Sequence, residues 1–285
     1  MLYTLKEVLT EAQKGKYAVG AFNITNPICL PPLLRAAESQ RSPLIINVAE
    51  VSFRDVDLMN FYPAIIHSAK EASVPIVVNL DHGTTEKGIM MALRCGFSSI
   101  MFDATAYSYE ENIRLTSRYS SMLHHVGVSL EGELGVIGGL EGTEDVDGTD
   151  VGLYTDVSTV KHFVDETQVD ALAVSIGNVH GFYKGEPNLQ FDLLKEIASV
   201  TSVPLVLHGG SGISDDDFRK AASLGICKIN FYTGASVSVF NHLDAKMKEL
   251  NGKYTDMANI GWTIMDAYQQ TIEERMHVFG SSGKA

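Results

Sequence analysis

Eight short apolar segments recur along the chain, and each is followed by a polar or glycine-containing loop and then by a stretch with helical periodicity. They lie at residues 18–23, 43–48, 75–80, 98–103, 126–131, 171–176, 204–208 and 226–231. Continuous apolar runs that alternate with helices are typical of parallel strands covered by helices. Eight of them in 285 residues predict an α/β fold of the TIM type, the (β/α)8 barrel.

An open, doubly wound sheet is the alternative arrangement of such segments. That fold carries a glycine fingerprint after its first strand, and residues 21–26 contain no such pattern. No linker or change of composition divides the sequence, so we expect one domain over residues 1–285. Its first helix is expected to begin after Thr4 as N-cap and to end near Gly15. Residues 135–152 are glycine-rich and acidic, and they predict a mobile loop at an active site.

The charge balance and the cysteines exclude several classes of protein. The chain has 22 Lys and Arg against 35 Asp and Glu, a net charge of −13, which disfavours binding to nucleic acid or to an anionic membrane. Its apolar runs, such as residues 74–80, are far shorter than a membrane span. Cys29, Cys95 and Cys227 are odd in number and form no CxxC pair, which argues against disulfides. No export signal is found, and we expect a cytoplasmic protein.

Three of the nine histidines lie at or after the carboxyl ends of predicted strands. His82 and His180 follow the third and sixth strands, and His208 ends the seventh; barrel active sites gather at the carboxyl ends of strands. Three neutral imidazoles from separate strands leave a fourth position open for water or substrate, which is the donor set of a catalytic zinc ion. The other histidines fall in helical stretches, where a solvated or capping role is preferred: His67, His124, His125, His162, His242 and His277.

Several carboxylates add to the same rim of the predicted barrel. Asp103 ends the fourth strand and Glu133 lies just past the fifth, where they could form a second metal position or hold a histidine tautomer. Asp81 stands beside His82 and can exchange a proton with a substrate hydroxyl. Glu141, in the acidic loop, is a candidate for proton transfer at carbon, with a solvated loop charge as the alternative.

A phosphate site is predicted at the loops after strands seven and eight, where barrels commonly hold one. Residues 209–212, Gly-Gly-Ser-Gly, offer backbone N–H groups, although a tight turn capped by Ser214 is the alternative. Asn230, with Thr233 and Gly234, opens the next helix, whose N-terminus favours an anion. A metal ion, one phosphate and an adjacent aspartate together fit a phosphorylated hydroxy-ketone as ligand.

With these residues in place, the sequence resembles the class II, zinc-dependent fructose-bisphosphate and tagatose-bisphosphate aldolases over nearly its whole length. The matching segments are residues 17–23, 80–83, 131–135 with 138–139, 177–181, 205–212 and 228–230. The resemblance implies a homodimer or homotetramer of barrels that reversibly cleaves a ketose 1-phosphate or 1,6-bisphosphate to dihydroxyacetone phosphate and an aldehyde. Such a reaction belongs to carbohydrate metabolism and glycolysis.

The resemblance also implies roles for individual residues. Asp81 would donate and accept the proton, and the three histidines would bind zinc. Substrate contacts are implied for Asn23, Gly181, Gly209, Gly210, Ser211, Asn230, Phe231, Tyr232 and Thr233. A sodium or potassium ion near the carbonyl groups of Val179, Gly181 and Gly209 is implied as well.

Departures from the family pattern bear on the substrate. Residues 49–51, Ala-Glu-Val, stand where relatives show a serine and small residues, and Phe231-Tyr232 replaces a small or polar pair. An Asp-Pro-Arg of many relatives is absent from residues 251–254, and Arg54 could take its place. The sequence therefore does not decide whether the substrate carries a second phosphate. A non-bisphosphate sugar or sugar-acid phosphate is an alternative substrate.

Three rival functions remain at the level of sequence. A Schiff-base aldolase would use Lys228, the only lysine within a predicted strand, although an interior ion pair or a ligand contact is the preferred role for this lysine. A zinc hydrolase would use metal-bound hydroxide, although no His-x-His lies on the first strand. An inactive sugar-phosphate-binding protein would keep the scaffold without the reaction.

Overall fold

The computed structural model describes residues 1–51, 56–139, 152–181, 183 and 185–285. In this part of the chain, eight parallel strands close into a barrel in sequence order, and β8 pairs with β1. The strands are β1 (Val19–Asn23), β2 (Leu44–Ala49), β3 (Ile76–Gly83), β4 (Ser99–Phe102), β5 (Ser129–Leu134), β6 (Ala171–Val174), β7 (Leu205–Leu207) and β8 (Ile226–Asn230). The predicted (β/α)8 barrel is confirmed.

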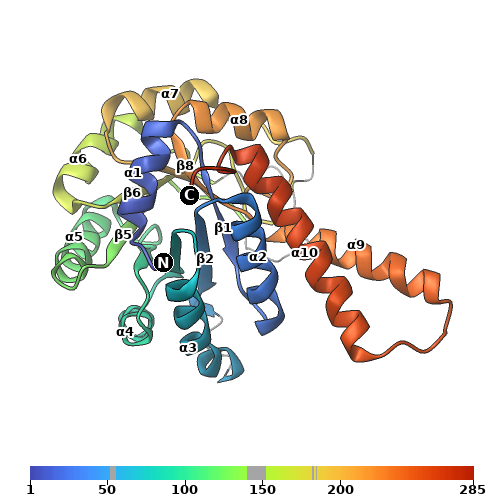
Figure 1. Cartoon of the computed structure of the whole chain (residues 1–285). Helices are drawn as coiled ribbons and strands as arrows, with labels where there is room; N and C mark the ends of the chain where they lie inside the picture. The colour runs from blue at the N-terminus through green and yellow to red at the C-terminus, as the bar shows by residue number, and fades with distance from the viewer. Residues whose placement is uncertain (52–55, 140–151, 182, 184) are drawn as a thin grey trace.

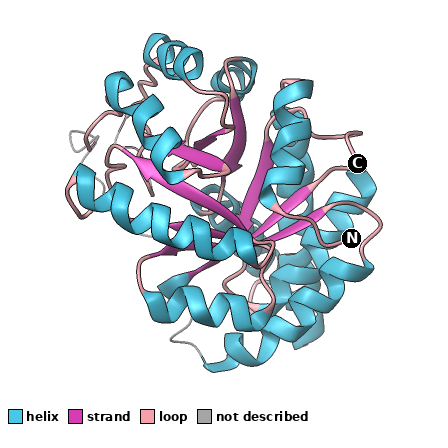
Figure 2. Ribbon diagram, turned by 90° about the vertical axis from the view of Figure 1, so that its left-hand side faces the viewer, coloured by secondary structure: helices cyan, strands magenta, loops and turns pink. Residues whose placement is uncertain are grey.

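Helices surround the strands on the outside of the barrel (Figure 2). They are α1 (Leu5–Gly15), the 3-10 helix η1 (Pro27–Cys29), α2 (Leu30–Gln40), α3 (Val56–Glu71), α4 (Glu86–Cys95), α5 (Tyr109–His125), α6 (Val157–Thr167), α7 (Phe191–Val200), α8 (Asp215–Ser223), α9 (Thr233–Leu250) and α10 (Met257–Phe279). Among the described residues, no helix is both long and apolar enough to cross a membrane.

Helix α1 closes the amino-terminal end of the barrel. Thr4 and Glu7 form a reciprocal capping box at its start, as the sequence predicted. Its buried face includes Leu5 and Leu9, which pack in one cluster with the barrel-interior residues Val77 and Val206. Each such buried side chain contributes about 1.5–3 kcal/mol of hydrophobic stabilisation. The half of the barrel interior nearest the amino-terminal ends of the strands is therefore an apolar core.

The alternation of side chains along each strand sorts the residues between two cores. In β3, Ile76, Val78 and Leu80 belong to the outer core, which lies between the strands and the helices. Val77 belongs to the interior cluster. The same alternation directs Asp81, four residues after Val77, into the barrel.

One predicted strand is displaced in the structure. The fifth segment was expected at 126–131, but β5 covers Ser129–Leu134. Val126 is the C-cap of α5, and Gly127 takes a positive φ of 73° that turns the chain toward the sheet. Glu133 consequently lies inside the strand and not just past it.

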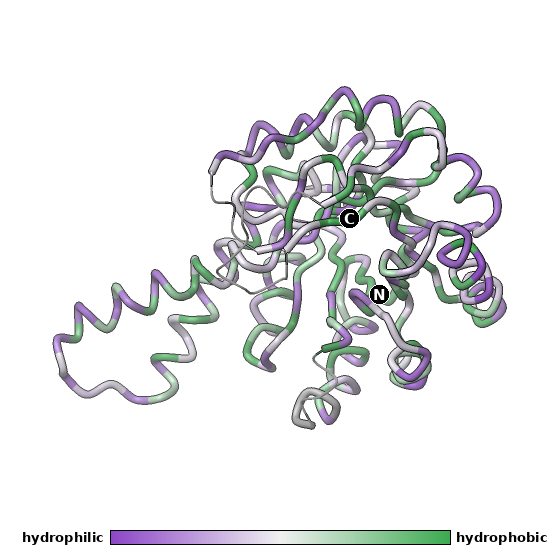
Figure 3. Tube along the Cα trace, turned by 180° about the vertical axis from the view of Figure 1, so that it is seen from behind, coloured by the Kyte–Doolittle hydropathy of each residue, from purple (hydrophilic) through white to green (hydrophobic). Residues whose placement is uncertain are grey.

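Helices α9 and α10 form a hairpin that projects beyond the barrel (Figures 1 and 3). The later part of α10 packs against the body, where Tyr268 and Ile272 are buried. Large apolar side chains are exposed on the hairpin: Phe240, Met247, Tyr254, Met257 and Trp262.

Candidate active site

A layer of buried polar side chains lies above the apolar core, toward the carboxyl ends of the strands. Burying a polar or charged group costs free energy unless it is hydrogen-bonded or paired. The barrel nevertheless encloses Asn23, Asn47, Asn79, Asp81, Glu131, Glu133, His180, His208, Lys228 and Asn230. Such a concentration of buried polarity indicates a site of chemistry rather than a stabilising core.

The three predicted histidines meet in this layer. One ring nitrogen from each of His82, His180 and His208 lies within 4.8 Å of the others. The His82 ring centroid is 4.9 Å from both of the others. Burial lowers the pKa of His208 well below its usual value, so this imidazole is neutral near pH 7. Three imidazoles gathered in this way suit a zinc ion.

Asp81 and His82 reach the same site although they are neighbours in a strand. Consecutive strand residues normally point to opposite faces. The pairing of β3 with β4 shifts register between Leu80 and Gly83, and His82 takes a left-handed φ of 46°. This irregularity turns the His82 ring toward the other histidines, at a conformational cost typical of functional sites.

Two asparagines hold the carboxylate of Asp81. Asn23 Nδ2 donates to Oδ2 and Asn230 Nδ2 donates to Oδ1, each over 3.0 Å. Burial alone would raise the pKa of Asp81, but interactions with His82 and His208 outweigh it and lower the pKa. Asp81 is therefore an ionised carboxylate, oriented by hydrogen bonds and able to accept a proton.

Asp103 and Glu133 lie beside His82, as the sequence predicted. Asp103 Oδ2 is 3.1 Å from His82 Nδ1, and Oδ1 accepts hydrogen bonds from Thr105. These three side chains also form a second group whose ligand atoms lie within 4.8 Å of one another. Burial, aided by the charge of Asp103, raises the pKa of Glu133 to about 8. The structure thus brings both carboxyls to the rim.

A cavity of about 420 Å³ opens above the histidines. Its wall includes His82, His180, Asp103 and Glu133, together with Glu50 from the end of β2. A substrate in this cavity would contact His82 and His180, two of the three clustered imidazoles.

The predicted phosphate loops also come together. Gly210 N donates to Asn230 O over 3.1 Å, and Ser211 Oγ accepts a hydrogen bond from Gly234 N over 2.8 Å. Ser211 therefore lies at the N-terminus of α9, of which Thr233 is the first residue. Partial positive charge at a helix N-terminus favours an anion.

Close backbone packing joins the loops after β6 and β7. Gly209 has a φ of 66°, and a Cβ atom there would lie 2.0 Å from Val179 O. Tyr183 Oη accepts a hydrogen bond from Val179 N and donates one to Gly209 O. Burial raises the pKa of Tyr183 to about 12, so the hydroxyl keeps its proton. Gly181, the third residue whose carbonyl group the family resemblance assigns to a sodium or potassium ion, is buried in the loop after β6.

Some predicted residues lie apart from this cluster or outside the described residues. Phe231 packs against Phe218 and Phe279, and its N–H donates to Ala21 O. Glu141 and Arg54 fall outside the described residues.

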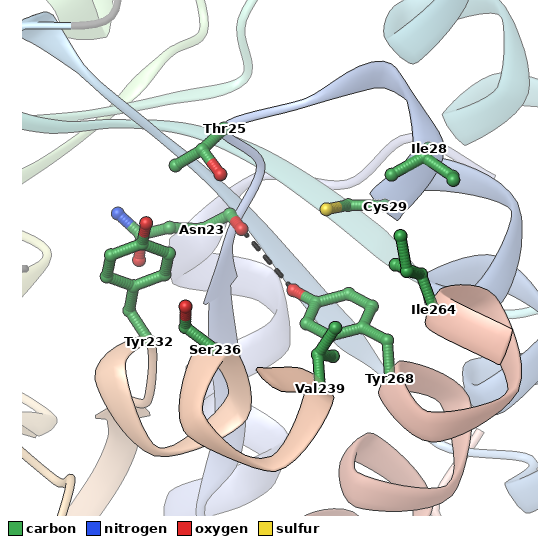
Figure 4. Close-up of a pocket in the computed structure, with 9 residues that line it drawn as sticks. All are labelled: Asn23, Thr25, Ile28, Cys29, Tyr232, Ser236, Val239, Ile264 and Tyr268. Carbon is green, nitrogen blue, oxygen red and sulfur yellow. Dashed lines mark hydrogen bonds between the residues drawn. The ribbon is translucent and has the colours of Figure 1, made fainter. Parts of the chain in front are cut away.

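Tyr232 lines a separate small cavity of about 90 Å³ between β1, α9 and α10. Figure 4 shows it beside Asn23, whose backbone oxygen accepts a hydrogen bond of 3.3 Å from Tyr268 Oη. Asn23 thus contacts Asp81 through its side chain and Tyr268, in the wall of the small cavity, through its backbone.

Comparison with known proteins decides between the reaction classes that this geometry permits. The family model described as fructose-bisphosphate aldolase class-II matches residues 3–284. The chain belongs to this family. Class II aldolases are metal-dependent lyases, and the histidine cluster is a donor set that fits a metal ion.

Similar class II aldolases carry different names. The chain is 39% identical to the fructose-bisphosphate aldolase of Geobacillus stearothermophilus, over 100% of this chain and 99% of that protein. It is 37% identical to the 6-phospho-5-dehydro-2-deoxy-D-gluconate aldolase of Bacillus velezensis, over 99% and 97%. The crystal structure of the YdjI aldolase from Escherichia coli K12 superposes with a TM-score of 0.88 at 35% identity and covers 100% of both chains.

Two residues of this class II aldolase site were missed at the level of sequence. Glu131 lies fully buried between Lys228 and His208, and Tyr183 ties Val179 to Gly209. A charged residue inside an apolar strand was the available signal for Glu131. An aromatic residue soon after His180 was a weaker signal for Tyr183.

Proposed function

We propose that this protein is a zinc-dependent aldolase that reversibly cleaves a ketose 1-phosphate to dihydroxyacetone phosphate and an aldehyde. The observation that carries the proposal is the convergence of His82, His180 and His208 beside the carboxylate of Asp81. The phosphate loops lie at the same end of the barrel, next to Asn230.

The three histidines would hold the zinc ion, which supplies a Lewis acid that polarises a ketone oxygen. Asp81 would accept the proton from the hydroxyl of the carbon that becomes the aldehyde and return it in condensation. Its hydrogen bonds from Asn23 and Asn230 hold the carboxylate in one orientation for this transfer. Glu141 is the proposed group for proton exchange at carbon.

The phosphate would bind at the loop of Gly209, Gly210 and Ser211 and at the start of α9. Backbone N–H groups and a helix terminus can hold one phosphate without a basic surface. A sodium or potassium ion is proposed at the carbonyl groups of Val179, Gly181 and Gly209, where the two loops pack together.

The proposal leaves several choices for the half of the substrate that becomes the aldehyde. Relatives at 39% and 37% identity are named for fructose bisphosphate and for a phosphorylated deoxygluconate. We infer that a ketose 1-phosphate is the minimal substrate, and that its far end carries either a second phosphate or another polar group such as a carboxylate.

A screen of ketose 1-phosphates that differ in length, stereochemistry and terminal group, scored by dihydroxyacetone phosphate released, tests the substrate. Loss of cleavage in EDTA and recovery with zinc are expected. Release of inorganic phosphate without carbon–carbon cleavage would favour a hydrolase. Tight binding of a ketose phosphate with no turnover by the zinc-loaded protein would favour a binding protein.

The Schiff-base alternative is disfavoured by the position of its lysine. Lys228 Nζ is fully buried and lies 2.6 Å from Glu131 Oε2. An amine paired in this way is neither a free nucleophile nor exposed to the cavity. Borohydride reduction is expected to trap no substrate on the protein; a trapped adduct would support this alternative.

We also propose one domain over residues 1–285 that forms a homodimer or homotetramer in the cytoplasm. Exposed apolar side chains on the projecting hairpin, including Trp262, support contact with a second copy. The unpaired Cys29, Cys95 and Cys227 suit a reducing compartment. Light scattering of the wild type and of Trp262→Glu tests the assembly, and a wild-type monomer would refute it.

A further inference from the structure

Three fully buried residues form a chain of contacts inside the barrel. Lys228 Nζ lies 2.6 Å from Glu131 Oε2, and Glu131 Oε1 lies 2.9 Å from His208 Nε2. All three side chains have an exposed fraction of 0%. Neither Glu131 nor Lys228 lines the cavity above the histidines.

Stability alone is a weak reason for such an arrangement. Removing two charges from water costs several kcal/mol per ion, and well-packed apolar residues often serve as well in their place. The pair is therefore expected to have another use. Its side-chain hydrogen bond to a third residue, within the described part of the chain, is the one to His208.

The contacts determine which nitrogen of His208 is left for a ligand. Lysine only donates hydrogen bonds, so Glu131 Oε2 accepts from Lys228. Glu131 Oε1 then accepts from His208 Nε2, which must carry the hydrogen of the neutral ring.

The opposite edge of the ring agrees with this assignment. His208 Nδ1 lies 3.1 Å from Asn230 Nδ2, which also donates to Asp81. An amide N–H group facing Nδ1 requires a lone pair on that nitrogen. Nδ1 is therefore the nitrogen that faces the site.

We propose that Glu131, held by Lys228, is the positioning residue of His208, which fixes the hydrogen on Nε2 and presents Nδ1 to the metal. This inference rests on the proposed zinc site. Groups that hydrogen-bond the outer nitrogen of a metal-binding histidine typically change metal affinity 10–100-fold when they are removed.

The decisive variant replaces both buried charges at nearly constant volume: Glu131→Gln with Lys228→Met. Glutamine can either donate to or accept from the ring, so it no longer selects one form of His208. Removing the lysine in the same protein avoids an unpaired buried cation, which would destabilise the fold. Circular dichroism and thermal unfolding of the metal-free protein establish that the variant folds.

The chain offers a matched control elsewhere in the barrel. Asp170 lies between Lys6, at 3.1 Å, and His124, at 2.8 Å, and it is also a buried carboxylate between a lysine and a histidine. It contacts none of the three clustered histidines. Asp170→Asn therefore reports what the loss of such a carboxylate does to stability alone.

Zinc affinity is measured by competition with a chromophoric chelator, and the Nε2–H proton of His208 is followed by NMR in the zinc-loaded protein. We expect a 10–100-fold loss of zinc affinity in the double variant and less than a twofold change in Asp170→Asn. The Nε2–H resonance should exchange slowly with water in the wild type and rapidly in the double variant.

Wild-type zinc affinity in the folded double variant would overturn the inference and leave the proposed function standing. A double variant that fails to fold is replaced by Glu131→Asp, whose shorter carboxylate cannot reach both partners, with the same expected loss. Unchanged zinc affinity in His208→Ala would instead overturn the proposed zinc site itself.

Discussion

Asp81 and Asn230, 149 positions apart in the chain, are joined by a hydrogen bond of 3.0 Å in the barrel interior. The same amide of Asn230 faces His208 Nδ1. One side chain therefore ties the proposed proton carrier to a proposed metal ligand, and the two functions can be separated by mutation.

Asp81→Ala is expected to retain zinc and to lose nearly all cleavage. The carboxylate belongs to none of the clusters whose ligand atoms lie within 4.8 Å of one another in the described residues. A positioned acid–base group typically contributes 10²–10⁴-fold to the rate, so a loss of about this size is expected. Metal analysis and steady-state kinetics, with Asp81→Asn as the isosteric variant, measure both effects. Normal turnover in either variant would remove Asp81 from the mechanism.

His208→Ala is expected to lose zinc affinity, because one of three imidazole donors disappears. His124→Ala is a suitable control, since that histidine lies on α5 and contacts Asp170 rather than the cluster. Zinc content after dialysis measures the difference. Equal zinc content and normal turnover in His208→Ala would contradict the assignment.

The buried carboxyl of Glu133 predicts a dependence of stability on pH in the metal-free protein. Its pKa is raised from 4.5 to about 8, so between these values the folded chain keeps a proton that the unfolded chain releases. The free energy of unfolding therefore falls as the pH rises through this window, by up to about 1.4 kcal/mol per pH unit.

Glu133→Gln lacks this proton and provides the reference. Urea unfolding of both proteins at pH 5, 6, 7 and 8, in the presence of EDTA, should show the wild type losing stability relative to the variant. A constant difference between them would show that Glu133 is ionised in the folded protein.

Gly209→Ala is expected to destabilise the protein more than Gly127→Ala does. Both glycines have a positive φ, which costs another residue roughly 1–2 kcal/mol. A Cβ at Gly209 would also lie 2.0 Å from Val179 O, whereas nothing lies within 4 Å of one at Gly127. Urea unfolding and phosphate-ligand binding of the two variants check this, and equal losses would mean that the loop moves freely aside.

The barrel could be predicted from the sequence because the strands lie in short, mostly apolar segments that alternate with helices, and this pattern needs no knowledge of which strands pair. The start of β5 could not, since Val126 continues the apolar pattern while Gly127 ends the preceding helix. Composition does not distinguish these two roles.

The candidate site likewise contains residues that local sequence position identifies and others that depend on how the strands pair. His82, His180 and His208 were found because position at the carboxyl end of an apolar segment is a local property. The pairing of Glu131 with Lys228 depends on the closure of the barrel, which brings together residues 97 positions apart. The bulge that lets Asp81 and His82 share one site depends on the pairing of β3 with β4.

Within the described residues, the apolar core that α1 forms with the barrel interior leaves the site open to solvent from one end only. Asp81 has no exposed surface, and beyond the buried Asn79, toward α1, lies the apolar interior around Val77. Protons and reactants must then pass through the open mouth above the histidines. A bound substrate would block this opening. The proton taken up by Asp81 would then stay in the enzyme until a product leaves, available to reverse the cleavage.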